Sequence, residues 1–370
     1  MWIRRSLALM GLTMALVQAG TSCARCELSE WKDWHVFQRE LIHSQGRVVD
    51  YSDDREITTS EGQSYAMFFA LVDNDQVLFH RLLRWTERNL AKGDLTSHLP
   101  AWLWGRDDKG NWRVLDENSA SDANLWIAYS LLEAGRLWKE HSYAALGSLM
   151  LQRIAKEETE NFPSFGTLLI PGKAGFLSET GGRLNPSYLA PQLLTRAHAA
   201  MPDSIWRRVL ESSVEFLVQS APLGLAPDWV DLHRGEIEPS TAGRVGSYNA
   251  IRVYLWVGML HDAALSAARL KSHFSQASKH IEIDGAVAES IDILNGTASE
   301  PGPIGFSAAM LPLFRHTDFG QRQRARIASL MRMPTGYYNR VLYLFGTGWD
   351  ENRFAFDEKG YLLPAWRRCR

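Results

Sequence analysis

This 370-residue chain is poor in features that would place it in several common classes. It has only 3 cysteines, and none of its Cys/His spacings resembles a zinc site. Apart from residues 7–17, no segment approaches the roughly 18 uninterrupted apolar residues that cross a bilayer. No Pro/Gly/Ser-rich linker divides the chain. We therefore expect one domain without a membrane-spanning helix, a metal or a cofactor.

The N-terminus has the pattern of a secretory signal peptide. Arg4 and Arg5 precede the apolar stretch, and small residues follow at positions 19–24. We predict a cut after Ala24, so that residues 1–24 are removed. The surrounding residues fit a twin-arginine signal poorly, so ordinary secretion is favoured. The mature domain, residues 25–370, is expected in the periplasm or outside the cell.

The cysteines agree with an oxidising compartment, because all of them lie near the ends of the chain. The predicted cut removes Cys23 and leaves Cys26 and Cys369, an even number suited to one disulfide. The alternative is a lipoprotein attached through Cys23. It is disfavoured because no leucine stands three residues before that cysteine. We predict a bond between Cys26 and Cys369.

Charge and aromatic content indicate the class of partner. The formal net charge of −2 becomes −4 after cleavage, because two arginines and no acidic residue are lost. That balance disfavours nucleic-acid binding. The chain has 14 Trp, 11 Tyr and 15 Phe, and aromatic faces pack well against the apolar faces of pyranose rings. Helical spacing assigns Trp85, Trp126 and Trp138 to the core instead.

Hydrophobic periodicity predicts a mainly helical chain. The helices are expected at 28–44, 61–73, 77–92, 122–138, 142–158, 187–200, 204–220, 248–270, 305–315, 320–332 and 335–346. Strand signals are few and short, mainly at residues 167–170. Consecutive helices with short connections pack as antiparallel hairpins, so we predict a single all-α domain.

Three segments share one design, in which a serine precedes a carboxylate or amide and then an apolar run. In the first, Ser60 and Gln63 form a capping-box pattern that places Glu61 in the first turn of a helix. Residues 121–124 and 247–250 repeat this arrangement. A solitary acidic residue there would only complement the helix dipole. Three such segments suggest that three helix N-termini converge on one site.

These segments also resemble the motifs of family eight glycoside hydrolases. Residues 60–67 (SEGQSYAM) resemble the general-acid motif of that family. Residues 120–138 resemble its long signature, with Asn124 where an aspartate is usual, and residues 246–253 resemble a third motif, with Asn249 where an aspartate is expected. Family members encoded beside bacterial cellulose synthase share further stretches with this chain, namely 99–105 (LPAWLWG), 301–310 (PGPIGFSAAM) and 345–350 (FGTGWD).

The resemblance implies an (α/α)6 barrel with an open substrate groove at one end, and inverting hydrolysis by two carboxyl groups. Glu61 would be the general acid. The family assigns catalytic importance to the positions of Asp122 and Asn249, the latter as base. An amide cannot accept a proton from water as a carboxylate does. Asp122 must then orient the sugar, activate the water or do both, and Asp228 and Asp231 are the nearest spare carboxylates in sequence.

Several other side chains are predicted to bind the sugar chain. Arg252 follows Asn249 by three positions, so both can face the same groove. For Trp102 and Trp104, sugar stacking and simple burial are equally favoured. The predicted substrate-binding residues are Trp102, Trp104, Asn185, Tyr188, Asp228, Trp229, Tyr248 and Arg252.

Two functions remain open at this point. The first is an endo-1,4-β-glucanase that acts as a monomer on nascent cellulose, with the cellulose synthase complex as a possible partner. The second is a cellulose-binding accessory protein that hydrolyses poorly or not at all, because Asn249 replaces the expected base. We favour the enzyme, since Glu61 at its helix terminus has no evident purpose in a passive binder.

Overall fold

The computed structural model describes residues 30–238, 242–330 and 332–368. The predicted signal peptide and both cysteines of the predicted disulfide, Cys26 and Cys369, lie outside the described residues. No helix within the described ranges combines the length and the apolar character needed to cross a bilayer.

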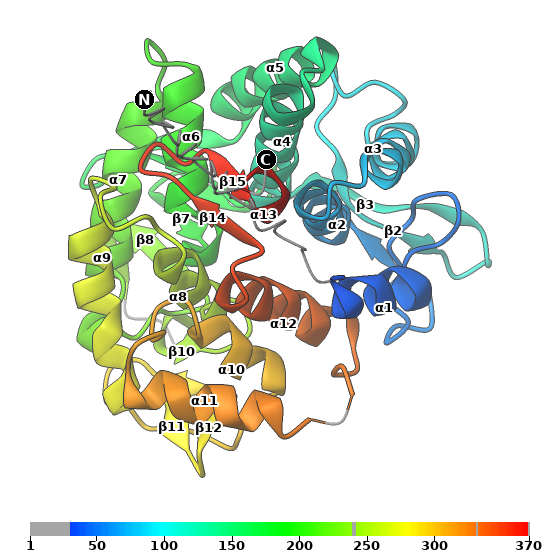
Figure 1. Cartoon of the computed structure of the whole chain (residues 1–370). Coiled ribbons are helices and arrows are strands. Elements are labelled where there is room, and N and C mark those ends of the chain that lie inside the picture. The colour runs from blue at the N-terminus through cyan, green and yellow to red at the C-terminus, as the bar shows by residue number, and fades with distance from the viewer. Residues whose placement is uncertain (1–29, 239–241, 331, 369–370) are drawn as a thin grey trace, which may run out of the picture.

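The described chain folds into two concentric rings of helices (Figure 1). Each inner helix packs on its inner neighbours, and each outer helix pairs with an inner one as a hairpin. The inner helices are α2 (Ser60–Val72), α4 (Ser121–Trp138), α6 (Pro191–Ala200), α8 (Ile251–Gly258), α10 (Ile304–Met310) and α12 (Tyr337–Asp350). The outer helices are α1 (Lys32–Leu41), α3 (Gln76–Leu90), α5 (His141–Glu157), α7 (Trp206–Gln219), α9 (Ala267–Phe274) and α11 (Asp318–Ala328). A short α13 (Ala365–Arg368) follows.

Aromatic side chains from four inner helices fill the barrel axis. Tyr65 of α2 contacts Trp126 of α4, with ring centroids 5.8 Å apart. Trp126 contacts Trp256 of α8 at 5.1 Å, and Trp256 contacts Phe345 of α12 at 5.2 Å. Phe345 contacts Tyr65 at 5.2 Å and closes the circuit. These buried rings hold the inner helices in register.

Close approach between two inner helices explains a glycine in α12. A β-carbon built on Gly346 would lie 1.9 Å from the carbonyl oxygen of Ala308 in α10. Any side chain at this position would push the two helices apart. Gly346 belongs to the stretch 345–350 on which the family resemblance partly rests.

Short antiparallel strands lie in the connections between the helices of the barrel. The larger sheets have the orders β1-β2-β3 and β6-β7-β8-β9. Their strands are β1 (Thr58–Thr59), β2 (Ala101–Arg106), β3 (Trp112–Ser119), β6 (Leu177–Ser178), β7 (Gly181–Leu184), β8 (Val230–His233) and β9 (Glu236–Glu238). Two-stranded pairs are β4 (Thr159–Phe162) with β5 (Gly166–Leu169), β10 (Val245–Gly246) with β13 (Ile291–Asp292), β11 (Glu282–Ile283) with β12 (Ala286–Val287), and β14 (Phe354–Phe356) with β15 (Leu362–Pro364).

The helix predictions hold except in two places. The predicted helix 187–200 is interrupted: residues Pro186–Tyr188 form a 3-10 turn, and α6 begins at Pro191, because proline disfavours helix at the residue before it. The predicted helix 248–270 is two helices, α8 and α9. α8 ends at Gly258, a poor helix former, and a β-carbon built there would lie 2.3 Å from the Leu313 amide nitrogen.

Candidate active site

The three predicted helix starts converge on one buried arginine, Arg252 of α8. Its Nη1 donates hydrogen bonds to Glu61 Oε2 and to Asp122 Oδ2, the latter at 3.0 Å. Its Nη2 donates to Asn249 Oδ1 at 2.9 Å. Glu61, Asp122 and Asn249, which are 61 and 127 residues apart in sequence, therefore share one guanidinium. Arg252 bridges the space between Glu61 and Asn249, and Asp122 lies beside it.

At the start of α2, the predicted serine cap is wrong. Thr59 is the N-cap, and its Oγ1 accepts a hydrogen bond from the Gly62 amide at 3.0 Å. Ser60 is the first helical residue, and its buried hydroxyl has no partner within the described residues. Gln63 instead accepts from the Val48 amide at 2.6 Å, which ties α2 to an earlier loop. Glu61 still lies in the first turn, and its side chain is 21% exposed.

At the start of α4, the serine is again not the cap, because Ala120 occupies that position. Asp122 lies in the first turn, with only 4% of its side chain exposed. Its Oδ1 accepts from the Ala123 amide at 2.7 Å, and its Oδ2 faces Arg252. Burial raises the pKa of Asp122 to about 7, although the nearby arginine opposes this shift. Asp122 thus changes charge near neutrality.

The segment before α8 is held by a different carboxylate, Asp228. Its Oδ1 accepts three backbone amides, those of Ser247 (2.9 Å), Asn249 (2.9 Å) and Ala250 (2.7 Å). The predicted cap Ser247 donates instead to the Glu289 carbonyl at 2.5 Å. Burial raises the pKa of Asp228, and the three amides oppose the shift. This oxygen of Asp228 therefore positions the Asn249 backbone, a role that the sequence did not suggest.

The amide of Asn249 has a defined orientation. Arginine offers only donors, so the atom facing Arg252 must be the carbonyl oxygen of Asn249. The same oxygen accepts from Asn185 Nδ2 at 3.0 Å. The NH₂ group of Asn249 is consequently turned away from both Arg252 and Asn185. Asn249 presents a donor, not a basic oxygen, to the remaining space of the site.

Of four other predicted residues, two contact this cluster and two are neighbours in sequence of residues that hold it. Asn185 contacts Asn249 directly, and the Tyr188 ring lies 5.7 Å from the Arg252 guanidinium carbon. Tyr248 is exposed and donates its hydroxyl to Glu289 Oε1 at 2.5 Å. Trp229 adjoins Asp228 in the chain. The other contacts of Trp229 are a parallel stack on Phe176 at 6.0 Å and Arg183 at 5.3 Å from its ring.

Trp102 and Trp104 belong to strand β2, in a part of the chain for which the sequence predicted no strand. They alternate with the buried residues Ala101 and Leu103, so both half-buried indoles share the other face of the strand. We did not predict a hairpin here, because β3, the strand that pairs with β2, is largely polar and lacks the apolar alternation typical of a strand.

Two tyrosines near Arg252 were also missed. The Tyr65 hydroxyl accepts from Arg252 Nη1 at 3.1 Å. Its place one helical turn after Glu61 was a usable signal. Tyr338 of α12 lies with its ring 6.0 Å from the guanidinium carbon and donates its hydroxyl to the Tyr248 carbonyl. Nothing in the local sequence marks Tyr338, because it reaches the site from the last inner helix.

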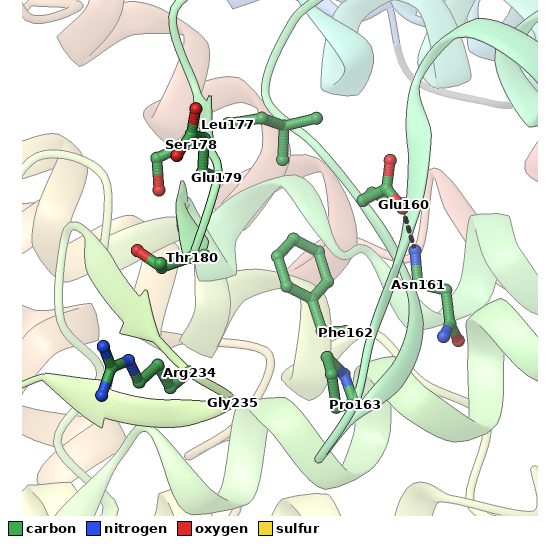
Figure 2. A pocket seen from close by; sticks show the side chains of 11 residues that line it. Glu160, Asn161, Phe162, Pro163, Leu177, Ser178, Glu179, Thr180, Arg234 and Gly235 are labelled. Carbon is green, nitrogen blue, oxygen red and sulfur yellow. Dashed lines mark hydrogen bonds between the residues drawn. The ribbon is translucent and has the colours of Figure 1, made fainter.

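A separate hollow of about 460 Å³ lies between the β4–β5, β6–β7 and β8–β9 turns (Figure 2). It is lined by Phe162, Leu177, Glu179 and Arg234, among others, and none of its lining residues belongs to the Arg252 cluster. Within the described part of the chain, no group of three or more His, Cys, Asp or Glu side chains has the arrangement of a metal site.

Comparisons with known proteins agree with this architecture. Residues 4–352 match the model of glycosyl hydrolases family 8. The chain is 46% identical to an endoglucanase of Escherichia coli O157:H7 over 96% of both chains. Its fold matches the crystal structure of an endo-1,4-D-glucanase from Vibrio fischeri with a TM-score of 0.86 and 46% identity, over 91% of this chain and 100% of that one. An endo-beta-1,4-glucanase from Acetobacter xylinum aligns with a TM-score of 0.71 and 26% identity, over 85% and 96% of the two chains.

The chain belongs to glycosyl hydrolases family 8. The predicted family and the predicted (α/α)6 barrel are confirmed.

Proposed function

We propose that this protein is an endo-1,4-β-glucanase that cleaves internal bonds of cellulose-like chains by an inverting acid/base mechanism. One observation carries the proposal: in a family 8 barrel, Glu61, Asp122 and Asn249 from three inner-helix starts meet at Arg252. The names of the relatives described above, all endoglucanases, support the same substrate class.

Glu61 serves as the general acid that protonates the leaving sugar oxygen. Its side chain is more exposed than those of Asp122 and Arg252, so it is the member of the cluster that a substrate can reach. In the resting site Arg252 donates a hydrogen bond to Glu61 Oε2. During catalysis the Glu61 side chain turns from Arg252 toward the glycosidic oxygen, to which it transfers a proton.

Asp122 serves as the second carboxylate. Asn249 cannot accept a proton, and Asp228 is engaged by three backbone amides. A group that titrates near 7 is suited to accept a proton from the attacking water. However, Glu61 and Asp122 share one guanidinium nitrogen, so their facing oxygens lie closer than the roughly 6.5 to 9.5 Å of an inverting pair. Movement of Glu61 away from Arg252 opens the space for water.

The test is release of new reducing ends from carboxymethyl-cellulose by the purified mature protein. The anomer formed first is followed by proton NMR. We expect cleavage, a rapid fall in viscosity and the α-anomer as first product. If the protein binds cellulose but releases no reducing ends, the accessory-protein hypothesis replaces the enzyme.

The biological setting follows from the family resemblance. We propose export through the signal peptide of residues 1–24 and action in the periplasm on the product of a cellulose synthase. Fractionation of a producing strain tests the location. A deletion that leaves cellulose production unchanged would count against the link to synthesis.

A further inference from the structure

The β2–β3 hairpin presents one large aromatic ring to solvent. Trp112, at the start of β3, is 45% exposed. Among residues 101–119 it is the one large hydrophobic side chain with such exposure. The glucanase mechanism proposed above gives Trp112 no task. Its exposure therefore needs another explanation.

Three neighbours contact the Trp112 ring and hold it in place. It stacks on Trp104 with an interplanar angle of 10° and ring centroids 5.0 Å apart. The Arg47 guanidinium carbon lies 4.5 Å from the Trp112 ring and 4.6 Å from the Trp104 ring, and Arg106 lies 5.3 Å from Trp112. Trp104 in turn packs edge-on against Trp85 at 5.3 Å.

Both arginines are themselves anchored. Arg47 donates to Thr58 Oγ1 at 2.9 Å and to the Glu56 carbonyl, and Arg106 donates to Glu56 Oε1 at 2.7 Å. The indole is thus held in one orientation before any ligand arrives. A ligand that packs on the exposed part of this ring loses little affinity to ordering of the protein.

The hairpin is continuous with the active site. Strand β2 pairs with β1, with Thr58 opposite Trp104 and Thr59 opposite Leu103. Thr59 is also the cap of α2, and Glu61 follows two residues later. The hairpin lies beside α2 in Figure 1. A polymer that leaves the cleavage site on this side passes the hairpin.

The surroundings of Trp112 select a sugar over a protein partner. Protein interfaces bury an extended apolar centre, whereas Trp112 is a single ring among exposed polar residues such as Arg113 and Glu117. A pyranose needs one flat apolar surface for its C–H face, and polar groups around it for its hydroxyls. We propose that Trp112 is a stacking platform for a glucose unit of a β-1,4-glucan chain, several units from the bond that is cut. This inference rests on the proposed glucanase function.

Binding in a non-cleaving background tests the platform. The Glu61→Gln variant is titrated with cellohexaose and with cellotriose by calorimetry, and compared with Glu61→Gln combined with Trp112→Ala. We expect Trp112→Ala to weaken cellohexaose binding about threefold to tenfold, the effect of one aromatic stack, and to leave cellotriose unchanged. Trp112→Tyr, which keeps a flat ring, should restore most of the affinity. Leu149→Ala, which removes a side chain of 44% exposure on outer helix α5, should change neither ligand.

Cleavage assays separate this inference from the proposed function. With Glu61 intact, Trp112→Ala should raise KM for long chains and preserve kcat on short ones. If affinity and KM are the same with Trp112 and with Trp112→Ala, the platform proposal is wrong and the proposed glucanase function still stands. Equal loss for cellotriose and cellohexaose would also overturn the platform proposal, since the effect would then be structural. Failure of every variant to bind or cut either oligosaccharide would overturn both proposals.

Discussion

Two buried clusters of carboxylate and arginine in this barrel have opposite charge balances. At the candidate active site, one arginine, Arg252, forms ion pairs with two carboxyl groups, those of Glu61 and Asp122. Toward the C-terminal end of α4, Glu133 accepts from Arg196 Nε at 2.7 Å, and from Arg136 Nε at 3.0 Å. The backbone amide of residue 362 donates to the same carboxylate at 2.8 Å. In this second cluster, two arginines form ion pairs with one carboxylate.

This difference explains why one cluster can do chemistry and the other can only hold the fold. At Glu133, donors are in excess: two arginines and one backbone amide all donate to a single carboxylate. An excess of carboxyl groups leaves the site short of donors, so burial raises the pKa of Asp122 to about 7 and its proton can leave near neutrality. The predictions below test this contrast.

The largest effect is expected at the acid. Glu61→Gln keeps the shape of the side chain but removes its transferable proton. We expect kcat on carboxymethyl-cellulose to fall by about 10² to 10⁴-fold, the contribution of a general acid. The temperature of unfolding should change little, because Glu61 is partly exposed. Retention of more than a tenth of the activity would show that another group is the acid.

In the cluster around Glu133, replacement of the carboxylate should lower the stability of the fold. Glu133→Ala leaves Arg196 buried without its carboxylate, and we expect the free energy of unfolding to fall by about 3 to 5 kcal/mol. Urea denaturation measures this loss. The control is Glu215→Ala, which breaks an exposed pair with Arg269 and should cost about 0 to 1 kcal/mol. Comparable losses in the two variants would contradict the distinction between the clusters.

A third carboxylate can be added to the site. In Asn249→Asp the new oxygen replaces the NH₂ group that faces the remaining space of the site, while the oxygen that accepts from Arg252 and Asn185 is retained. We expect an increase of about tenfold or more in kcat, because a dedicated base then faces the water. Unchanged or lower activity would indicate that Asp122 already fulfils this task and that Asn249 is adapted to it. Asn185→Ala should reduce the gain by removing one donor.

How much of this site the sequence predicts depends on how local each signal is. Glu61 and Asp122 lie in first turns, and their segments indicated convergence before the structure did. The serine caps were wrong, because Thr59 caps α2 and Asp228 holds the start of α8 from another segment. Tyr338 reaches Arg252 only through the closed ring of helices. Arg47 reaches the rings of Trp104 and Trp112 only through the pairing of distant strands. No pattern within one segment reports such contacts.

The most gradual effect is expected in the dependence of stability on pH. An aspartate in an unfolded chain titrates near 4, whereas Asp122 in the folded protein titrates near 7. Between these values the folded protein holds a proton that the unfolded chain has lost. The free energy of unfolding therefore falls as pH rises from about 4 to 7, by at most about 1.4 kcal/mol per pH unit for this one group. Asp122→Asn removes this contribution, so the stability of this variant should decline less steeply over the same window in urea denaturation.

Glu158→Gln is the matched control away from Arg252. Glu158 is buried against Ser119 and Asn124, burial raises its pKa to about 7, and its replacement should flatten the curve similarly without changing the pH profile of kcat. An unchanged slope in Asp122→Asn would show that Asp122 does not exchange its proton in this pH window, and would remove the contrast between the two clusters.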